Sequence, residues 1–168
     1  MLKKRSLSRG LGRAALPKQD VEPGLGFLLR ETYRGFAREL DKRLARHCIT
    51  HAQWVLLWFL QQARTLTPTA LSESAGIKKA SVTAAIEVLR TSGLISAERD
   101  KLDGRKINLR LTPLGHASMK ELAECAAAAN RRGLRGLDQR SSELLRKLLK
   151  RVSINFEKTS DKRIFRSE

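Results

Sequence analysis

The side chains best suited to a chemical task in this sequence are cations around one short turn. Four of them flank the hairpin dipeptide Asp103-Gly104: Arg99, Lys101, Arg105 and Lys106. A guanidinium at the end of a hairpin can enter the minor groove of DNA, where the negative potential is concentrated. We therefore predict that this turn contacts DNA, mainly through Arg105. We expect Asp103 to pair with a neighbouring Arg and fix the turn, or to serve only as a turn former.

A second group of polar and small side chains precedes the turn. Val82, Ile86 and Leu89 have helical spacing, so a helix over about 78–92 buries one face and leaves the other free. On or near that free face we place Thr69, Lys78, Lys79, Ala80, Ser81, Thr83 and Ala84. The lysines suit phosphates or guanine edges, the hydroxyls suit base or phosphate hydrogen bonds, and the alanines suit thymine methyls.

The elements that position these groups follow from local signals. Thr67-Pro68 is typical of a helix start, and Gly76 suits the left-handed turn that ends it. The next helix should end at Gly93, which makes a helix-turn-helix. Apolar and polar residues alternate over 106–111, which predicts a half-buried strand paired with 96–100. The hairpin would be a wing beside the second helix.

These motifs together resemble a known family. The segment GLISAERDKLDGRKINLRLTPLG is similar to the wing signature of the MarR family of bacterial winged-helix regulators, with Asp103 to Arg105 as its D-x-R. Leu111, Thr112 and Gly115 match the entry into its long helix, and THAQW from Thr50 matches the start of its second helix. The resemblance covers about residues 25–157. The family often has Ser or Thr where Lys78 stands and Arg near Ala84, so the sequence preference stays open.

The composition agrees with a polyanion partner. Lys and Arg number 34 against 17 Asp and Glu, a formal net charge of +17, which predicts strongly salt-dependent binding. An architectural or RNA-binding basic protein without a defined operator remains an alternative. No apolar run approaches the ~20 residues that span a bilayer, so we expect no membrane partner. The start is basic, but no apolar segment follows it. We therefore expect a cytoplasmic, nucleoid-associated protein rather than an exported one.

The expected fold is mainly α with a small β-hairpin wing. We divide the chain into a basic arm (1–20), an N-terminal dimerisation helix (21–48), the winged helix-turn-helix lobe (49–112), C-terminal dimerisation helices (113–157) and a charged tail (158–168). The resemblance implies a homodimer through the first and last helices. An apolar stripe from Leu144 to Phe156 fits either a second subunit or packing within one chain. A dimer requires a pseudo-palindromic operator.

The sequence predicts no catalytic site, no metal and no cofactor. It has no G-x-S-x-G, P-loop or H-E-x-x-H motif, and the two cysteines form no zinc or C-x-x-C pattern. Some MarR-like proteins sense oxidants through a cysteine near the first helix, so Cys48 is a redox candidate, against a plain residue at a helix end.

The resemblance also implies regulation by a small molecule. MarR-like proteins commonly bind aromatic acids between the dimer helices and the DNA-binding lobe. By position, Tyr33, Arg34, His51 and Trp54 are the ligand candidates, with Trp58 less favoured; packing is an alternative role for each. We therefore predict a homodimeric repressor that a small aromatic or phenolic ligand, or its conjugate, releases from DNA.

Overall fold

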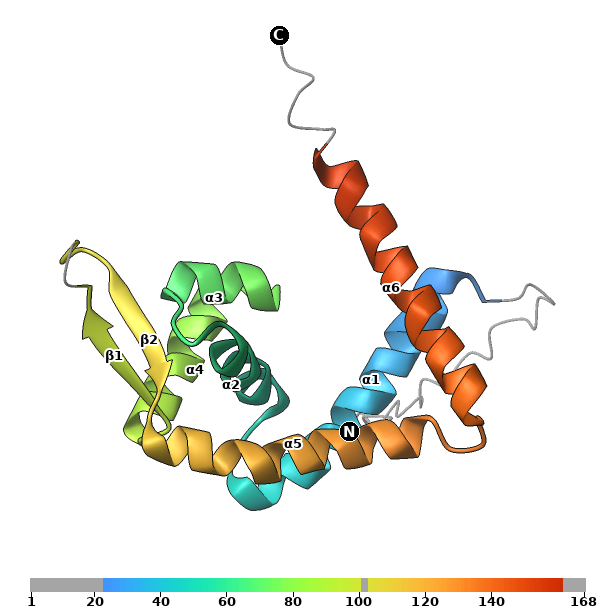
Figure 1. Cartoon of the computed structure of the whole chain (residues 1–168), viewed down its shortest axis with the longest axis horizontal. Helices are drawn as coiled ribbons and strands as arrows, with labels where there is room; N and C mark the ends of the chain where they lie inside the picture. Colours follow the sequence, from blue (N-terminus) through green and yellow to red (C-terminus); the bar gives the residue numbers. More distant parts are fainter. Residues whose placement is uncertain (1–22, 101–102, 162–168) are drawn as a thin grey trace, which may run out of the picture.

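The computed structural model describes residues 23–100 and 103–161, and only the backbone of 157–161. In chain order the elements are α1 (Leu25–Leu44), a 3-10 turn η1 (Ala45–His47), α2 (His51–Ala63), α3 (Pro68–Ala75), α4 (Lys79–Thr91), β1 (Ile95–Arg99), β2 (Ile107–Leu111), α5 (Pro113–Gly133) and α6 (Gln139–Asp161). Helices α2 to α4 and the hairpin gather at one end of α5, whereas α6 rises from its other end beside α1 (Figure 1). This mainly helical fold with a hairpin wing is the one predicted.

The core lies in the lobe and along α5. Fully buried side chains of α2, α3, α4, β2 and α5 form one apolar cluster that includes Leu57, Leu71, Leu89, Leu109 and Leu122. The almost uniformly apolar sequence of α2 predicts a centrally buried helix, and this prediction is wrong for Trp58. Its side chain is 44% exposed and stacks edge-on against Phe59, with ring centroids 5.0 Å apart.

The predicted helix starts and stops are confirmed. Thr50 and Gln53 form a capping box, and the Thr67 hydroxyl accepts the Ala70 N–H at 3.2 Å. Gly76 and Gly93 have φ of +63° and +71°, which a glycine adopts without steric cost. These caps satisfy backbone groups that a helix end leaves unpaired, so they fix where each element of the lobe begins and ends.

A close approach joins the lobe to α5. A Cβ added to Gly115 would lie 2.1 Å from the carbonyl oxygen of Leu94, so only glycine fits there. The Thr112 hydroxyl accepts the Gly115 N–H and donates to the carbonyl of Gly93 at 2.6 Å. The end of α4, the base of the wing and the start of α5 are therefore held as one unit.

The C-terminal helix is longer than predicted. We expected a charged tail from residue 158, but α6 continues to Asp161. The segment contains no Gly or Pro, and its Glu and Lys are good helix formers, so nothing in the sequence stops the helix. The Asp138 carboxylate caps its start by accepting the Ser141 N–H at 2.7 Å. The predicted basic arm and the end of the chain lie outside the described residues, and none of the described helices is long and apolar enough to cross a bilayer.

Candidate nucleic-acid interface

Helix α4 presents the predicted free face. Val82 and Leu89 are buried against the lobe and Ile86 is half-buried, so the other side of α4 faces outward. All the residues predicted to contact the major groove are exposed: Thr69, Lys78, Lys79, Ala80, Ser81, Thr83 and Ala84. Thr69 comes from α3 and the others from the start of α4. The polar and small side chains form one accessible surface at the helix N-terminal half.

Two hydroxyl groups at or beneath this surface donate hydrogen bonds to backbone carbonyls. The Thr83 hydroxyl donates to the carbonyl of Lys79 at 3.0 Å, so toward DNA it offers an acceptor and a methyl group. Sequence reasoning missed Ser72, which is buried and donates to the carbonyl of Ile77 at 2.6 Å. This bond holds the turn between α3 and α4. Its signal was a serine on the buried side of a short helix, where the hydroxyl needs a partner.

The wing is a regular antiparallel hairpin. Ile95 pairs with Leu111 and Arg99 with Ile107, so β1 begins one residue earlier than predicted. Leu109 and Leu111 are buried as expected, but the prediction for Ile107 was wrong, because its side chain is 47% exposed. It lies beyond the edge of the lobe, where the core no longer covers the hairpin. Arg99, Arg105 and Lys106 are exposed, and Lys101 lies outside the described residues.

Hydrogen bonds fix the described part of the wing tip. The Asp100 carboxylate accepts the Asp103 N–H at 2.9 Å and the Asn108 side-chain amide at 2.7 Å. Asp103 then accepts the N–H of Arg105 at 3.1 Å, which sets the backbone where Arg105 leaves the turn. The sequence prediction that Asp103 pairs with an Arg was wrong: its ion-pair partner is Lys106, at 3.6 Å.

Sequence reasoning missed Asp100 and Asn108. The available signal was an Asp three residues before a second Asp in a turn, because such side chains often accept backbone N–H groups just ahead of them. Pairing Asp100 with Asn108 needs the strand register, which only the structure supplies.

The structure brings two of the four ligand candidates together. The rings of Tyr33 and His51 lie 5.6 Å apart, and Phe36, which sequence reasoning missed, lies 6.3 Å from His51. Arg34 instead pairs with Glu31 at 3.3 Å on the surface. Trp54 is only 8% exposed and belongs to the core, so it offers little surface to a ligand.

The cysteines are separate in the structure. Cys48 is exposed and has a left-handed backbone with φ of +55°, whereas Cys125 is fully buried beneath the Arg46 guanidinium, 3.4 Å from its sulfur. Within residues 23–100 and 103–161 no three His, Cys, Asp or Glu side chains come together as metal ligands do.

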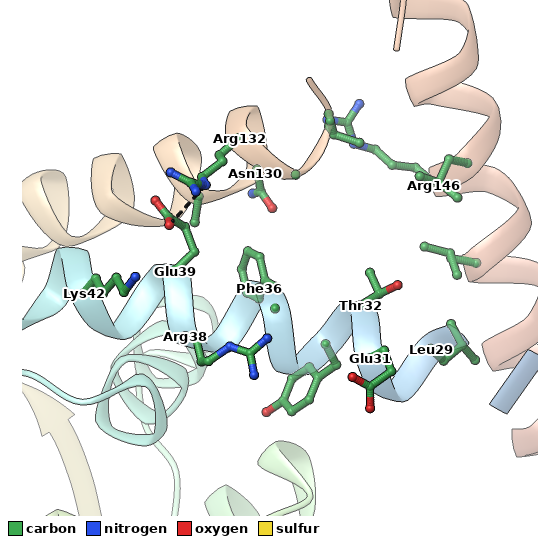
Figure 2. A pocket seen from close by; sticks show the side chains of 17 residues that line it. Leu29, Glu31, Thr32, Phe36, Arg38, Glu39, Lys42, Asn130, Arg132 and Arg146 are labelled. Carbon is green, nitrogen blue, oxygen red and sulfur yellow. Dashed lines mark ion pairs between the residues drawn. The ribbon is translucent and has the colours of Figure 1, made fainter. Parts of the chain in front are cut away.

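A cleft of about 770 Å³ opens at the other end of the molecule, between α1, α5 and α6 (Figure 2). Phe36 and leucines of α1 and α6 form its apolar wall. Its rim is largely charged: Arg132 of α5 reaches Glu39 of α1 at 3.3 Å, and Arg38 and Lys42 lie nearby (Figure 2).

An exposed helix-turn-helix face beside a cationic hairpin defines a winged helix-turn-helix protein. Residues 49–106 match the family model described as MarR family. The chain is 30% identical over 92 residues to the regulator PetP of Rhodobacter capsulatus, an alignment that covers 55% of each chain, so it spans about half of PetP's length.

Two solved structures are similar over most of the chain. Reduced MarR from E. coli has a TM-score of 0.72 at 23% identity, covering 80% of this chain and 98% of that one, which shows the shared fold. BpsR of Bordetella bronchiseptica has a TM-score of 0.70 at 26% identity, covering 76% and 97%. The chain therefore shares its fold with E. coli MarR, and its residues 49–106 match the MarR family model.

Proposed function

We propose that this protein is a homodimeric repressor that binds a pseudo-palindromic operator, with α4 in the major groove and the β1–β2 wing in the flanking minor groove. One observation carries the proposal. The free face of α4 and the cationic wing belong to one packed lobe, so their relative position is fixed before DNA arrives. Such preorganisation lets several base and phosphate contacts form together without ordering costs.

The proposed dimer covers the apolar surfaces that the single chain leaves open. On α1 these are Leu25, Phe27 and Leu28, and on α6 they include Leu144, Leu148 and Phe156, which are 49–66% exposed. Contiguous apolar surface of this kind is typical of a protein interface. The cleft between α1, α5 and α6 offers a seat for a helix of the second copy (Figure 2). A two-fold axis then places two lobes about one DNA turn apart.

The proposed effector is a small aromatic or phenolic molecule, or its conjugate, bound near the Tyr33–His51–Phe36 rings. These rings lie where α1 meets α2, between the proposed dimer helices and the lobe. The similar protein BpsR has its DNA binding regulated by 6-hydroxynicotinic acid, which supports this ligand class. The effector releases the operator only if it binds the released geometry more tightly than the DNA-bound one.

Two alternatives make different predictions. A redox regulator would use Cys48, whose exposure gives an oxidant access; peroxide should then weaken operator binding in the wild type and not in Cys48→Ser. An architectural protein would bind DNA without a defined operator, and excess random DNA would then remove it from every fragment equally.

Selection of bound genomic fragments tests the main proposal. We expect one short palindrome to stay bound against excess random-sequence DNA. On that palindrome, Arg105→Ala should weaken binding at least tenfold, since a good contact is worth ~1–3 kcal/mol. Arg90→Ala is the matched control, because Arg90 is ion-paired with Glu87 at 2.7 Å in the last turn of α4. Equal affinities of the two variants would contradict the proposed docking.

A further inference from the structure

Helix α6 has two chemically different sides. Its apolar residues Leu144, Leu148 and Val152 recur at intervals of four, whereas Lys147 and Lys150 lie on the opposite side with Arg140 and Arg151 at its edge. A fifth cation, Arg146, lines the cleft between α1, α5 and α6. The only acidic residue between Gln139 and Phe156 is Glu143, which accepts from Gln139 at 3.0 Å. All five cations are exposed. If the apolar side is covered by a second copy, as the proposed function has it, the cationic side is the one that still faces solvent.

Most of the net positive charge of the chain lies outside the DNA-binding lobe. Residues 49–112 carry nine Lys and Arg against five Asp and Glu, a net charge of +4, whereas the whole chain has +17. Helix α6 from residue 139 to 156 alone carries +4. The lobe therefore accounts for only a small part of the attraction that this protein exerts on a polyanion.

The α6 cations differ from those of the neighbouring helices. On α1 and α5 several arginines are neutralised locally: Arg43 and Arg132 pair with Glu39, and Arg131 pairs with Glu124. Within the part of the chain that the structure describes, no ion pair involves the five α6 cations. Their charge is available to a partner.

We propose that the cationic side of α6 is a second DNA-binding surface, which holds the phosphate backbone of a duplex segment other than the operator. From residue 140 to 151 the cations extend over ~16 Å of helix, and a DNA strand presents about five phosphates over that length. Helix α6 rises from the end of α5 opposite the lobe, so α4 and the wing leave it free (Figure 1). Contacts from lysine and arginine to phosphates position a duplex without reading its sequence.

DNA suits this surface better than an anionic membrane does. A membrane-bound amphipathic helix inserts its apolar side into the lipid. Here that side continues toward the apolar cleft against α1, through Leu145 and Leu149. The phosphate groups of a duplex need only the cationic side, so both sides of α6 can be occupied at once.

The test compares two triple variants that lose the same charge. One is K147Q/K150Q/R151Q on α6, and the control is R30Q/K120Q/R131Q, three exposed cations outside both α6 and the lobe. Binding to a long random-sequence duplex is measured against salt by fluorescence anisotropy. We expect the slope of log K against log salt to fall by about 2 to 3 in the α6 variant, at ~0.9 per phosphate contact, and by less than about 1 in the control.

Further measurements keep the inference separate from the proposed function. Sedimentation and thermal melting should show both variants folded and unchanged in assembly, and both should keep their affinity for a short duplex with only the selected palindrome. Equal slopes in the two variants would overturn the inference and leave operator binding intact. Loss of binding to phosphatidylserine vesicles, with an unchanged DNA slope, would overturn it in favour of a membrane surface.

Discussion

The Asp100→Asn substitution distinguishes two contributions to operator affinity, the geometry of the wing and its negative charge. The carboxylate accepts the N–H of Asp103 at 2.9 Å and the amide of Asn108 at 2.7 Å. An asparagine at this position keeps one acceptor oxygen but turns an amide group toward the amide of Asn108, so one of the two bonds is lost. Arg105 then leaves a turn that is less strongly fixed.

The two effects of this change have opposite signs. Hydrogen bonds to charged groups are worth ~1.5–3 kcal/mol, and partial exposure of Asp100 reduces the loss to about 1 kcal/mol. If DNA must order the wing again, that loss weakens operator binding about fivefold. Removal of a negative charge near the phosphates would, by itself, strengthen binding. The direction of the change therefore identifies the cause.

The assay is operator affinity by anisotropy at fixed salt, with Glu98→Gln as control. Glu98 is an exposed carboxylate on β1, opposite Asn108, so its neutralisation makes the same charge change on the same hairpin. We expect slightly tighter binding for E98Q and weaker binding for D100N. The double variant D100N/R105A should lose no more operator affinity than R105A alone, because the ordered wing acts on DNA by positioning Arg105. The reasoning would be refuted if D100N bound the operator more tightly than the wild type. It would also be refuted if the affinity losses of D100N and R105A added up in the double variant.

Three further predictions test the scaffold. Gly115→Ala should destabilise the protein by at least ~1–3 kcal/mol in urea unfolding, because its Cβ meets a backbone carbonyl; Gly133→Ala, with open space around it, should be neutral or stabilising. Leu148→Asp should convert the proposed dimer to monomer in sedimentation, while Ile154→Asp, on another side of α6, should not. The backbone N–H that caps α6 lowers the pKa of Asp138 below its ordinary value of 3.8; helix content by circular dichroism should therefore fall as the pH drops below 3.8, and Asp138→Ala should remove that dependence.

The parts of the fold set by local chemistry were predictable. Thr50, Thr67 and Thr112 each precede a helix and accept an N–H within it, and Gly76 and Gly93 take the left-handed turns. Such signals act over three or four residues, so the sequence contains them in full. The exposed positions of α4 followed from helical period in the same way.

Apart from the ends of α6 and β1, the errors concern contacts made in the tertiary structure. Trp58 and Ile107 are apolar and lie in apolar patterns, but within the described residues no packed surface covers them fully. Trp54 has the chemistry of a ligand wall and lies in the core instead. The partners of Asp100 and Asp103 depend on the hairpin register. Periodicity tells which side of an element is apolar, and only the tertiary structure tells what lies against it.

Hydrogen bonds between the lobe and helices α1 and α5 suggest how a ligand bound near α1 acts on DNA binding by α4. The Asp41 carboxylate of α1 accepts the N–H of His51 at 2.7 Å, at the first residue of α2, and Thr112 binds the end of α4 to the start of α5. Hydrogen bonds therefore join the lobe to both of the helices that carry it. In the proposed mechanism a ligand beside Tyr33 and His51 binds next to this connection between α1 and α2 and rotates the packed lobe as one body. Since α4 and the wing move together, a small rotation changes the spacing between the two α4 helices and between the two wings of the proposed dimer. All the contacts with the operator are then weakened together.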